Sequence, residues 1–251
     1  METDYSNLVS VIIPIYNAEQ YIEETIETVF SQTYDPIEIV LVDDCSRDNS
    51  AKVIEKYVDG NKVRYYKQPR NLGAAEARNR GIDAAYGRYI AFLDSDDLWD
   101  SDKVRKQVDF LKANNAAFVF TAYDMIDMRG IPIQEKIKIQ TTVSYKDLMR
   151  KTMISTPTVM IDRIKLKDIS FPLRRTGQDY ALWLKLLRET DAYGIDEALV
   201  HVRRRPGSLS KNKFQNIRDI WEIQQAEGVS PVNRVINIIL YCIYTVKKRF
   251  L

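Results

Sequence analysis

The chain has 251 residues, of which 45% are hydrophobic and 29% charged, as in a soluble globular protein with one large α/β domain. The formal net charge of +2 gives no nucleic-acid signature, so we expect no nucleic-acid partner. Two cysteines and one histidine argue against a Cys/His zinc site and against a disulfide framework. The first ten residues lack a signal-peptide pattern, and we expect a cytoplasmic protein.

The first half of the chain alternates apolar runs with amphipathic segments. Residues 8–14 form an apolar run that ends at a proline, which is typical of a buried parallel strand. Asn17 is placed to cap a following helix, with Gln20 three residues further on. Further strands are predicted over residues 37–42, 63–66, 88–93 and 117–123, and helices over 50–58, 74–85 and 103–112. This alternation predicts a mostly parallel sheet with helices on both faces.

Beyond residue 125 the alternation loosens. Residues 131–139 are predicted to lie at the edge of the sheet, outside the regular alternation of strands and helices. Helices are predicted over 144–149, 178–188 and 214–225, and a strand over 158–161. The composition of residues 227–231 is that of a linker.

The C-terminal segment, residues 232–246, is largely apolar and is followed by Lys247, Lys248 and Arg249. It is too short, and too interrupted by polar residues, to span a bilayer. One interpretation is an amphipathic helix that lies on a membrane surface with basic residues facing anionic lipid. The alternative is a helix packed on its own domain or on a second subunit in a homodimer.

Polar and acidic residues follow three of the predicted strands, over residues 14–19, 43–48 and 94–97. Ligands of open α/β sheets bind at the carboxyl ends of the strands. If these strands are neighbours in the sheet, the three segments meet in one crevice.

The third segment, Asp94-Ser95-Asp96-Asp97, holds three carboxylates in four residues. Carboxylates this close repel one another unless a cation or a donor neutralises them. A hard divalent ion, Mn²⁺ or Mg²⁺, prefers oxygen ligands and shares them with substrate phosphates. The alternative is a solvated acidic turn that caps the next helix through Asp97 or Asp102.

The pair Asp43-Asp44 follows a buried run and is ambiguous by itself. A carboxylate at this place can accept hydrogen bonds from a nucleobase imide or a ribose hydroxyl. It can also cap the following helix, although Ser46 or Asp48 already serves that purpose.

Four motifs in this order resemble the family 2 glycosyltransferases, which have the GT-A fold. They are Val11-Ile12-Ile13-Pro14-Ile15-Tyr16-Asn17, Val42-Asp43-Asp44-Cys45-Ser46-Arg47-Asp48-Asn49-Ser50, Asn71-Leu72-Gly73 with Ala77-Arg78-Asn79-Arg80-Gly81, and Leu93-Asp94-Ser95-Asp96-Asp97. The resemblance implies a glycosyltransferase domain over residues 1–226. Its Rossmann-like nucleotide-sugar half covers 8–125, its acceptor half covers 126–226, and a C-terminal amphipathic helix covers 231–251.

The resemblance also implies roles for individual residues. Asp44 would bind the base, usually uracil, and Arg78 would lie near the donor phosphates or sugar. Asp96 and Asp97 would lie nearest the metal, with Asp94 as a third candidate ligand that could instead hold the ribose or the sugar. The other residues implied in nucleotide-sugar binding are Pro14, Tyr16, Glu19, Asp43 and Ser95.

In the second half, Gly177-Gln178-Asp179-Tyr180-Ala181-Leu182-Trp183 resembles the family's helix start that carries the general base. The resemblance assigns the base to Asp179, although Gln178 replaces the usual glutamate. The alternative for Asp179 is an acidic residue favoured by the helix dipole. Residues 202–210 resemble a basic loop of the family, from which Arg203 and Arg205 would bind the diphosphate.

The implied activity is inverting transfer of a sugar from a nucleoside diphosphate sugar, with UDP as the expected nucleotide. The expected acceptor is a saccharide or a polyprenyl-linked glycan in bacterial surface polysaccharide synthesis, at the inner face of the cell membrane. Two alternatives are a non-catalytic nucleotide-sugar-binding subunit and a sugar nucleotidyltransferase. The second would normally show a Gly-rich loop after the first strand, where this chain has Pro14-Ile15-Tyr16-Asn17.

Overall fold

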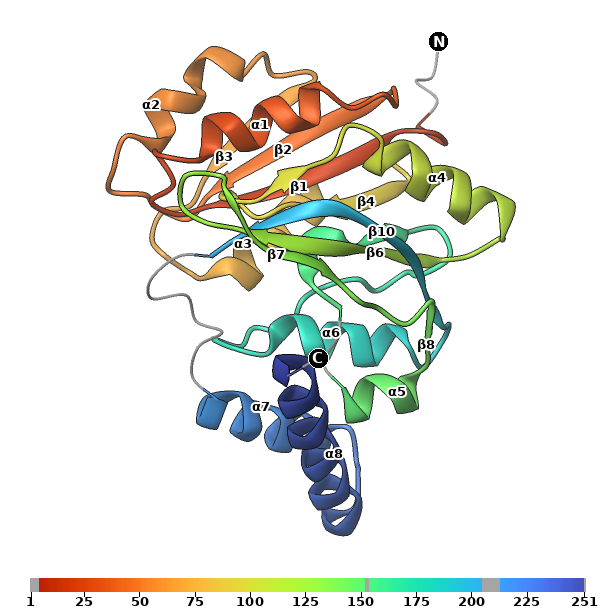
Figure 1. Cartoon of the computed structure of the whole chain (residues 1–251). Coiled ribbons are helices and arrows are strands. Elements are labelled where there is room, and N and C mark those ends of the chain that lie inside the picture. The colour runs from red at the N-terminus through yellow and green to blue at the C-terminus, as the bar shows by residue number, and fades with distance from the viewer. Residues whose placement is uncertain (1–4, 152–153, 205–212, 251) are drawn as a thin grey trace.

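A computed structural model describes residues 5–151, 154–204 and 213–250, without the side chains of residues 213 and 244–250. The expected α/β class is confirmed. Helices cover both faces of one central sheet (Figure 1). The described strands form a ten-stranded sheet with the order β3-β2-β1-β4-β9-β6-β10-β5, in which β7 pairs with β6 and β8 with β10.

The first four strands are parallel and form one half of the sheet. They are β1 (Val9–Ile15), β2 (Ile37–Asp43), β3 (Val63–Lys67) and β4 (Tyr89–Phe92). Every residue of β2 and β4 is buried, which explains why these runs are mostly apolar instead of alternating, with Glu38 and Asp43 as the charged residues of β2. Strand β1 lies in the middle of this half, between β2 and β4.

The second half of the sheet is mixed. Its two long strands, β6 (Phe118–Ile126) and β10 (Ala192–Arg203), are parallel to each other. The short strands pair antiparallel with their neighbours: β5 (Leu98–Trp99), β7 (Pro132–Ile137), β8 (Thr142–Val143) and β9 (Met160–Asp162). Strand β10 was not predicted from the sequence, because two register shifts and the pair Asp196-Glu197 interrupt its apolar pattern.

Two large hydrophobic clusters form most of the core, one on each face of the sheet, and a small third cluster joins Val40 and Val42 of β2 to Ala77. One cluster packs α1 (Ile22–Phe30), α2 (Ser50–Ile54) and α4 (Lys103–Ala113). The other packs α3 (Ala74–Ala84), α5 (Tyr145–Arg150), α6 (Gln178–Leu186) and α7 (Lys213–Ala226). Two short 3₁₀ turns, η1 (Glu55–Tyr57) and η2 (Thr156–Thr158), complete the elements of these layers.

The predicted helix cap at Asn17 is wrong. Helix α1 begins at Ile22, and Asn17 has a φ of 50°. The Asn17 side chain instead accepts a hydrogen bond from the Arg47 backbone N–H at 2.9 Å, so it joins the loops that follow β1 and β2. Asparagine adopts this backbone conformation more readily than most residues.

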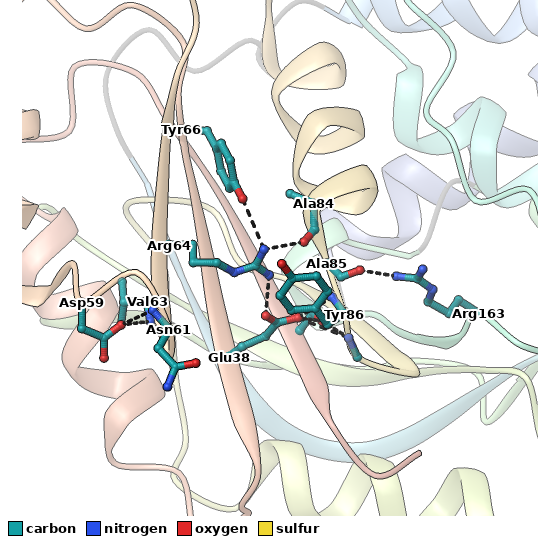
Figure 2. Close-up of polar contacts among 12 residues, drawn as sticks. Glu38, Asp59, Asn61, Val63, Arg64, Tyr66, Ala84, Ala85, Tyr86 and Arg163 are labelled. Atoms are coloured by element: carbon teal, nitrogen blue, oxygen red, sulfur yellow. Dashed lines mark hydrogen bonds and ion pairs between the residues drawn. The ribbon is translucent and has the colours of Figure 1, made fainter. Parts of the chain in front are cut away.

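A buried ion pair holds the amino ends of the strands together (Figure 2). The guanidinium of Arg64 on β3 pairs with Glu38 on β2 and donates to the carbonyl of Ala84 at 2.7 Å. Glu38 also accepts from the Ser10 hydroxyl and from the Tyr86 backbone N–H. Because the pair has several hydrogen-bond partners, we interpret it as structural support at the end of the sheet opposite to the candidate site.

Helix α8 (Pro231–Phe250) follows α7 after a turn at Gly228 and packs against α7 and α5. Ile238 and Tyr241 pack against the core cluster that includes α6. Thus α8 packs on its own domain, one of the placements considered from the sequence. None of the helices in the described chain is long and apolar enough to cross a membrane.

Candidate active site

The three polar segments follow β1, β2 and β4. These strands are neighbours in the sheet, with β1 in the middle, so the segments lie next to one another at the strand ends. Ile15 is paired with Asp43 at the ends of β1 and β2, and the Leu93 N–H donates to the Ile12 carbonyl at 3.1 Å. The expectation that the sheet order brings these segments together is therefore met for the described strands. The candidate site lies along this carboxyl edge.

The loops after β1 and β2 are joined by hydrogen bonds. The Glu19 carboxylate accepts from the Asn49 backbone N–H at 2.8 Å, and the Glu19 N–H donates to Asp48 at 3.0 Å. Pro14 is half-buried, whereas Tyr16 is 43% exposed beside it. Glu19 therefore shapes the wall of the site, and the exposed ring of Tyr16 is the part of this loop available to a ligand.

Asp43 and Asp44 are both buried and both hold loops in place. The Asp43 carboxylate accepts from the Ser46 N–H at 2.8 Å and from the Tyr65 hydroxyl at 2.9 Å. The Asp44 carboxylate accepts from the N–H groups of Leu72 and Gly73, each at 2.7 Å. Asp44 thus fixes the loop that enters α3.

Arg78 and Asp94 form an ion pair across the site. The Arg78 guanidinium, on α3, lies 2.5 Å from the Asp94 carboxylate, which is 34% exposed and so faces open space. Arg78 also lies over the ring of Phe171, 5.4 Å from its centroid. The contact of Arg78 with Phe171 links the ion pair to the segment that leads into α6.

Asp179 lies in the first turn of α6, close enough to Arg78 and Asp94 to interact with both electrostatically. Burial raises the pKa of the Asp179 carboxyl, and the positive charge of Arg78 opposes that rise. The carboxylate accepts a hydrogen bond from the Tyr180 N–H at 2.8 Å. A carboxylate with a raised pKa beside a site is suited to accept a proton.

Gly177 permits this placement of α6. It has a φ of 67°, which is accessible to glycine at little cost. A Cβ at this position would lie 2.9 Å from Ile223 Cδ1 and 3.2 Å from Asp219 Cβ, both on α7. Helix α7 therefore packs directly on the turn that presents Asp179.

Arg203 secures the acidic cluster from the end of β10. Its backbone N–H donates to the buried carboxylate of Asp97 at 2.8 Å, and its Nε donates to the Asp96 carbonyl at 2.8 Å. The rest of the guanidinium bonds to Glu24 at 2.7 Å and to the carbonyls of Asp127 and Met128. Because this side chain is only 1% exposed, Arg203 positions the cluster and has little surface for contact with a ligand.

The members of the cluster differ in their environment. Asp97 and Ser95 are buried, whereas Asp94 and Asp96 are half-buried. Burial and the nearby carboxylates of Asp94 and Asp96 hold the pKa of Asp97 well above its ordinary value, while the Arg203 amide acts in the opposite direction. The crowding of negative charge is what a divalent cation would relieve.

The cluster fits a cation that shares its ligands with a substrate. No three Asp, Glu, His or Cys side chains in the described residues converge on a protein-only metal site. Mg²⁺ and similar ions are commonly held by one or two carboxylates plus phosphate oxygens and water. Asp96 and Asp94 would supply those carboxylates. The Asp97 carboxylate already accepts a hydrogen bond from the Arg203 backbone N–H, so we expect Asp97 to stabilise the loop of the cluster and not to bind the cation.

Two features of the site were assigned no role from the sequence. Asn79 both donates to and accepts from the backbone of Phe171, at 2.9 and 2.7 Å. Glu24, in the first turn of α1, is the ionic partner of Arg203. Asn79 lies inside one of the quoted motifs, whereas Glu24 and Arg203 are 179 residues apart and no local signal links them. Arg205 lies outside the described residues.

Comparison with known families identifies the chain, because the model of glycosyl transferase family 2 matches residues 10–167. The chain belongs to glycosyltransferase family 2. It is an enzyme of the glycosyltransferase class, and the alternative of a sugar nucleotidyltransferase is set aside.

Two relatives of this family 2 glycosyltransferase match over nearly their whole length. It is 38% identical to a Bacillus subtilis (strain 168) protein assigned to teichuronic acid biosynthesis as glycosyltransferase TuaG, over 98% of this chain and 99% of that protein. It is 32% identical to WfgD of Escherichia coli, a UDP-Glc:α-D-GlcNAc-diphosphoundecaprenol β-1,3-glucosyltransferase, over 96% of this chain and 94% of that protein.

Solved structures confirm the GT-A fold of this glycosyltransferase. Staphylococcus aureus TarS 1-349 in complex with UDP-GlcNAc has a TM-score of 0.71 at 22% identity, over 92% of this chain and 70% of that one. The mannosyltransferase PcManGT of Pyrobaculum calidifontis, in complex with GDP-Man and Mn²⁺, has a TM-score of 0.70 at 16% identity. That match covers 91% of this chain and 66% of the other. At these identities the likeness concerns the fold alone.

Proposed function

We propose that this glycosyltransferase transfers a sugar from a UDP-sugar to a polyprenyl diphosphate-linked saccharide, with inversion, in bacterial surface polysaccharide synthesis. The observation that carries the proposal is the placement of Asp179 beside the Arg78–Asp94 pair. A proton acceptor from the second half of the chain thereby meets charged groups from the first half. Relatives named for teichuronic acid and for diphosphoundecaprenol acceptors support the acceptor class.

The donor would lie along the carboxyl edge of β2, β1 and β4. Tyr16 and Pro14 offer the wall for the base, and Asp44 with Asp43 fixes the loops around it. We assign uracil because S. aureus TarS, which has a similar fold, was solved in complex with UDP and with UDP-GlcNAc. Arg78 would lie near the diphosphate or the sugar, with Ser95 as a further contact on the diphosphate side.

Mn²⁺ or Mg²⁺ would be held by Asp96 and Asp94. When bound there, the cation supplies positive charge to the diphosphate that leaves the sugar. Asp97 and Arg203 position the backbone of the cluster through the 2.8 Å contact between them. In this arrangement the half-buried carboxylates of Asp94 and Asp96 would bind the cation, and the buried groups would orient them.

Asp179 would act as the general base. It would accept the proton of the acceptor hydroxyl as that oxygen attacks the anomeric carbon and the bond to the diphosphate breaks. A single base suffices for one direct displacement, so an α-linked donor would give a β-linked product. The acceptor being lipid-linked, the enzyme would work at the cytoplasmic face of the membrane.

The test is a transfer assay with a panel of UDP-sugars, Mn²⁺ and a synthetic polyprenyl diphosphate-GlcNAc acceptor. One donor should be turned over, and Asp179→Asn should lower the rate by roughly 10²–10⁴-fold. The exposed Asp191→Asn serves as the matched control and should keep the rate. Near wild-type transfer by Asp179→Asn would refute the assignment of the base, and a product with retained configuration would refute direct displacement.

A further inference from the structure

Helix α8 turns an apolar stripe outward, away from the domain. Six branched aliphatic side chains on the described part of the helix are 36–69% exposed. They recur every three or four residues and thus share one side of the helix. These residues, here called the outer stripe, are Val232, Val235, Ile236, Ile239, Leu240 and Ile243.

The opposite side of α8 is fixed to the domain through polar groups. The Asn237 side chain is buried and donates to Gln224 at 3.0 Å. Arg234, also buried, donates to Gln225 at 2.8 Å and lies 4.2 Å from the centroid of the Trp221 ring. All of these partners lie on α7. They fix the rotation of α8 about its own axis, so the outer stripe faces solvent.

The charge of α8 favours a lipid surface as the occupant. From Pro231 to the last residue the sequence has no Asp or Glu, and Lys247, Lys248 and Arg249 follow the stripe. An exposed apolar side with basic residues and no acidic ones is the pattern of helices that lie in the interface of anionic membranes. The segment is not a candidate for spanning, since no described helix meets the length and apolarity required.

A second copy of the chain fits the outer stripe less well. A coiled-coil seam uses alternating positions three and four residues apart, whereas the outer stripe includes the adjacent pairs Val235-Ile236 and Ile239-Leu240. Its width suits a flat surface. A standard protein interface also uses roughly 20–30 residues a side, and the stripe offers six.

We propose that α8 docks this glycosyltransferase on an anionic membrane, with the outer stripe inserted at the boundary between headgroups and acyl chains. The choice of a lipid surface rests in part on the proposed function, which places the acceptor in a membrane. Helix α7 contacts both α8 and the Gly177 turn that presents Asp179. Docking through α8 would therefore fix the orientation of the catalytic base relative to the membrane.

The test is sedimentation of the full chain with vesicles of phosphatidylglycerol and phosphatidylcholine. The triple variant Ile236→Ser, Ile239→Ser, Ile243→Ser should lose at least tenfold in vesicle affinity. The matched control, Ile131→Ser, Ile133→Ser, Ile164→Ser, removes three equally exposed isoleucines elsewhere and should bind as wild type does. Pure phosphatidylcholine vesicles should bind the wild type more weakly.

Transfer to a short-chain, water-soluble acceptor separates this inference from the proposed function. The outer-stripe variant should keep its thermal unfolding midpoint and its rate on that acceptor, while losing rate on acceptor embedded in vesicles. Unchanged vesicle binding by the variant would overturn the inference. So would a wild-type dimer that ignores vesicles and dissociates in the variant, because the stripe would then cover a second copy. A wild type that binds vesicles yet transfers to neither acceptor would refute the proposed function alone.

Discussion

The carboxamide of Asn79 forms two hydrogen bonds with the backbone of Phe171, accepting from its N–H at 2.7 Å and donating to its carbonyl at 2.9 Å. The two residues are 92 positions apart, on α3 and on the segment before α6. The bond pair holds the Phe171 ring against Trp183 and against the guanidinium of Arg78. It therefore connects α3, which carries Arg78, to the segment that leads into α6 and Asp179.

Asn79→Ala should lower the free energy of unfolding by about 1–3 kcal/mol, because two backbone groups of Phe171 lose their partner. The transfer rate should fall as well, since the Arg78 guanidinium loses its support. Denaturant unfolding and the transfer assay measure the two effects. Asn61→Ala, at an exposed turn, is the control. Full activity at reduced stability would show that Asn79 supports the fold without positioning the site.

Gly177→Ala should destabilise the protein more than Gly228→Ala does. Both glycines have positive φ, at 67° and 77°, so alanine costs about 1 kcal/mol of backbone strain in each. Only at Gly177 would the new Cβ meet a neighbour, at 2.9 Å from Ile223, and overpacking adds about 1–3 kcal/mol. Thermal unfolding compares the stability of the two variants. Equal losses of stability would mean that α7 moves to accommodate the new Cβ at residue 177.

Transfer should also suffer in Gly177→Ala and not in Gly228→Ala, because the first substitution displaces the turn that presents Asp179. Comparable rates in the two variants would contradict a positioning role for this turn.

Arg203→Lys should lower the free energy of unfolding by about 2–3 kcal/mol, because a lysine cannot reproduce the bonds to Glu24, Asp96 and the neighbouring carbonyls. Mn²⁺-dependent binding of UDP should weaken in parallel. Glu24→Gln, which removes a partly exposed partner, should cost less than about 1 kcal/mol. Lost UDP binding at unchanged stability would instead indicate direct contact between Arg203 and the diphosphate.

The acid limb of the pH profile of kcat/KM should lie above the ordinary aspartate pKa of about 3.9. Burial raises the pKa of Asp179, and a base works only when deprotonated, so the rate should fall as the pH drops through that raised value. Arg78 opposes the rise, so Arg78→Gln should move the limb to higher pH. An unmoved limb in that variant would assign it to another group.

Lys103 is fully buried against Trp99 and Gln107, and burial lowers its pKa well below the ordinary value. The unfolded chain therefore binds more protons than the folded one between the lowered pKa and about 10.4. Wild-type stability should gain from rising pH across this window. Lys103→Met should lack that gain, so its stability relative to wild type should decline as the pH rises. The surface variant Lys62→Met controls for lost charge, and parallel pH curves for Lys103→Met and wild type would contradict the prediction.

Local pattern was sufficient for the parallel half of the fold. The runs that became β1, β2 and β4 are mostly apolar because both of their faces are buried, and each is followed by its polar segment. The four motifs along this half also led to the family, which the comparison confirms. The residues expected at the strand ends meet there because neighbouring strands end at one edge.

Long-range pairing decided the rest. Strand β10 was not predicted because bulges and charged residues interrupt its alternation of apolar and polar residues. Its neighbour β6 lies about seventy residues earlier in the sequence. Arg203 appeared from the sequence to be a ligand for diphosphate, yet its partners come from α1, the acidic cluster and the end of β6. The sequence also showed that residues 232–246 are amphipathic. Only the tertiary contacts, those of Arg234 and Asn237 with α7 and the packing of Ile238 and Tyr241 against the core, determine which side faces the domain and leave the outer stripe facing out. Periodicity fixes which residues share a side of a helix, whereas the packing partner decides which side is buried.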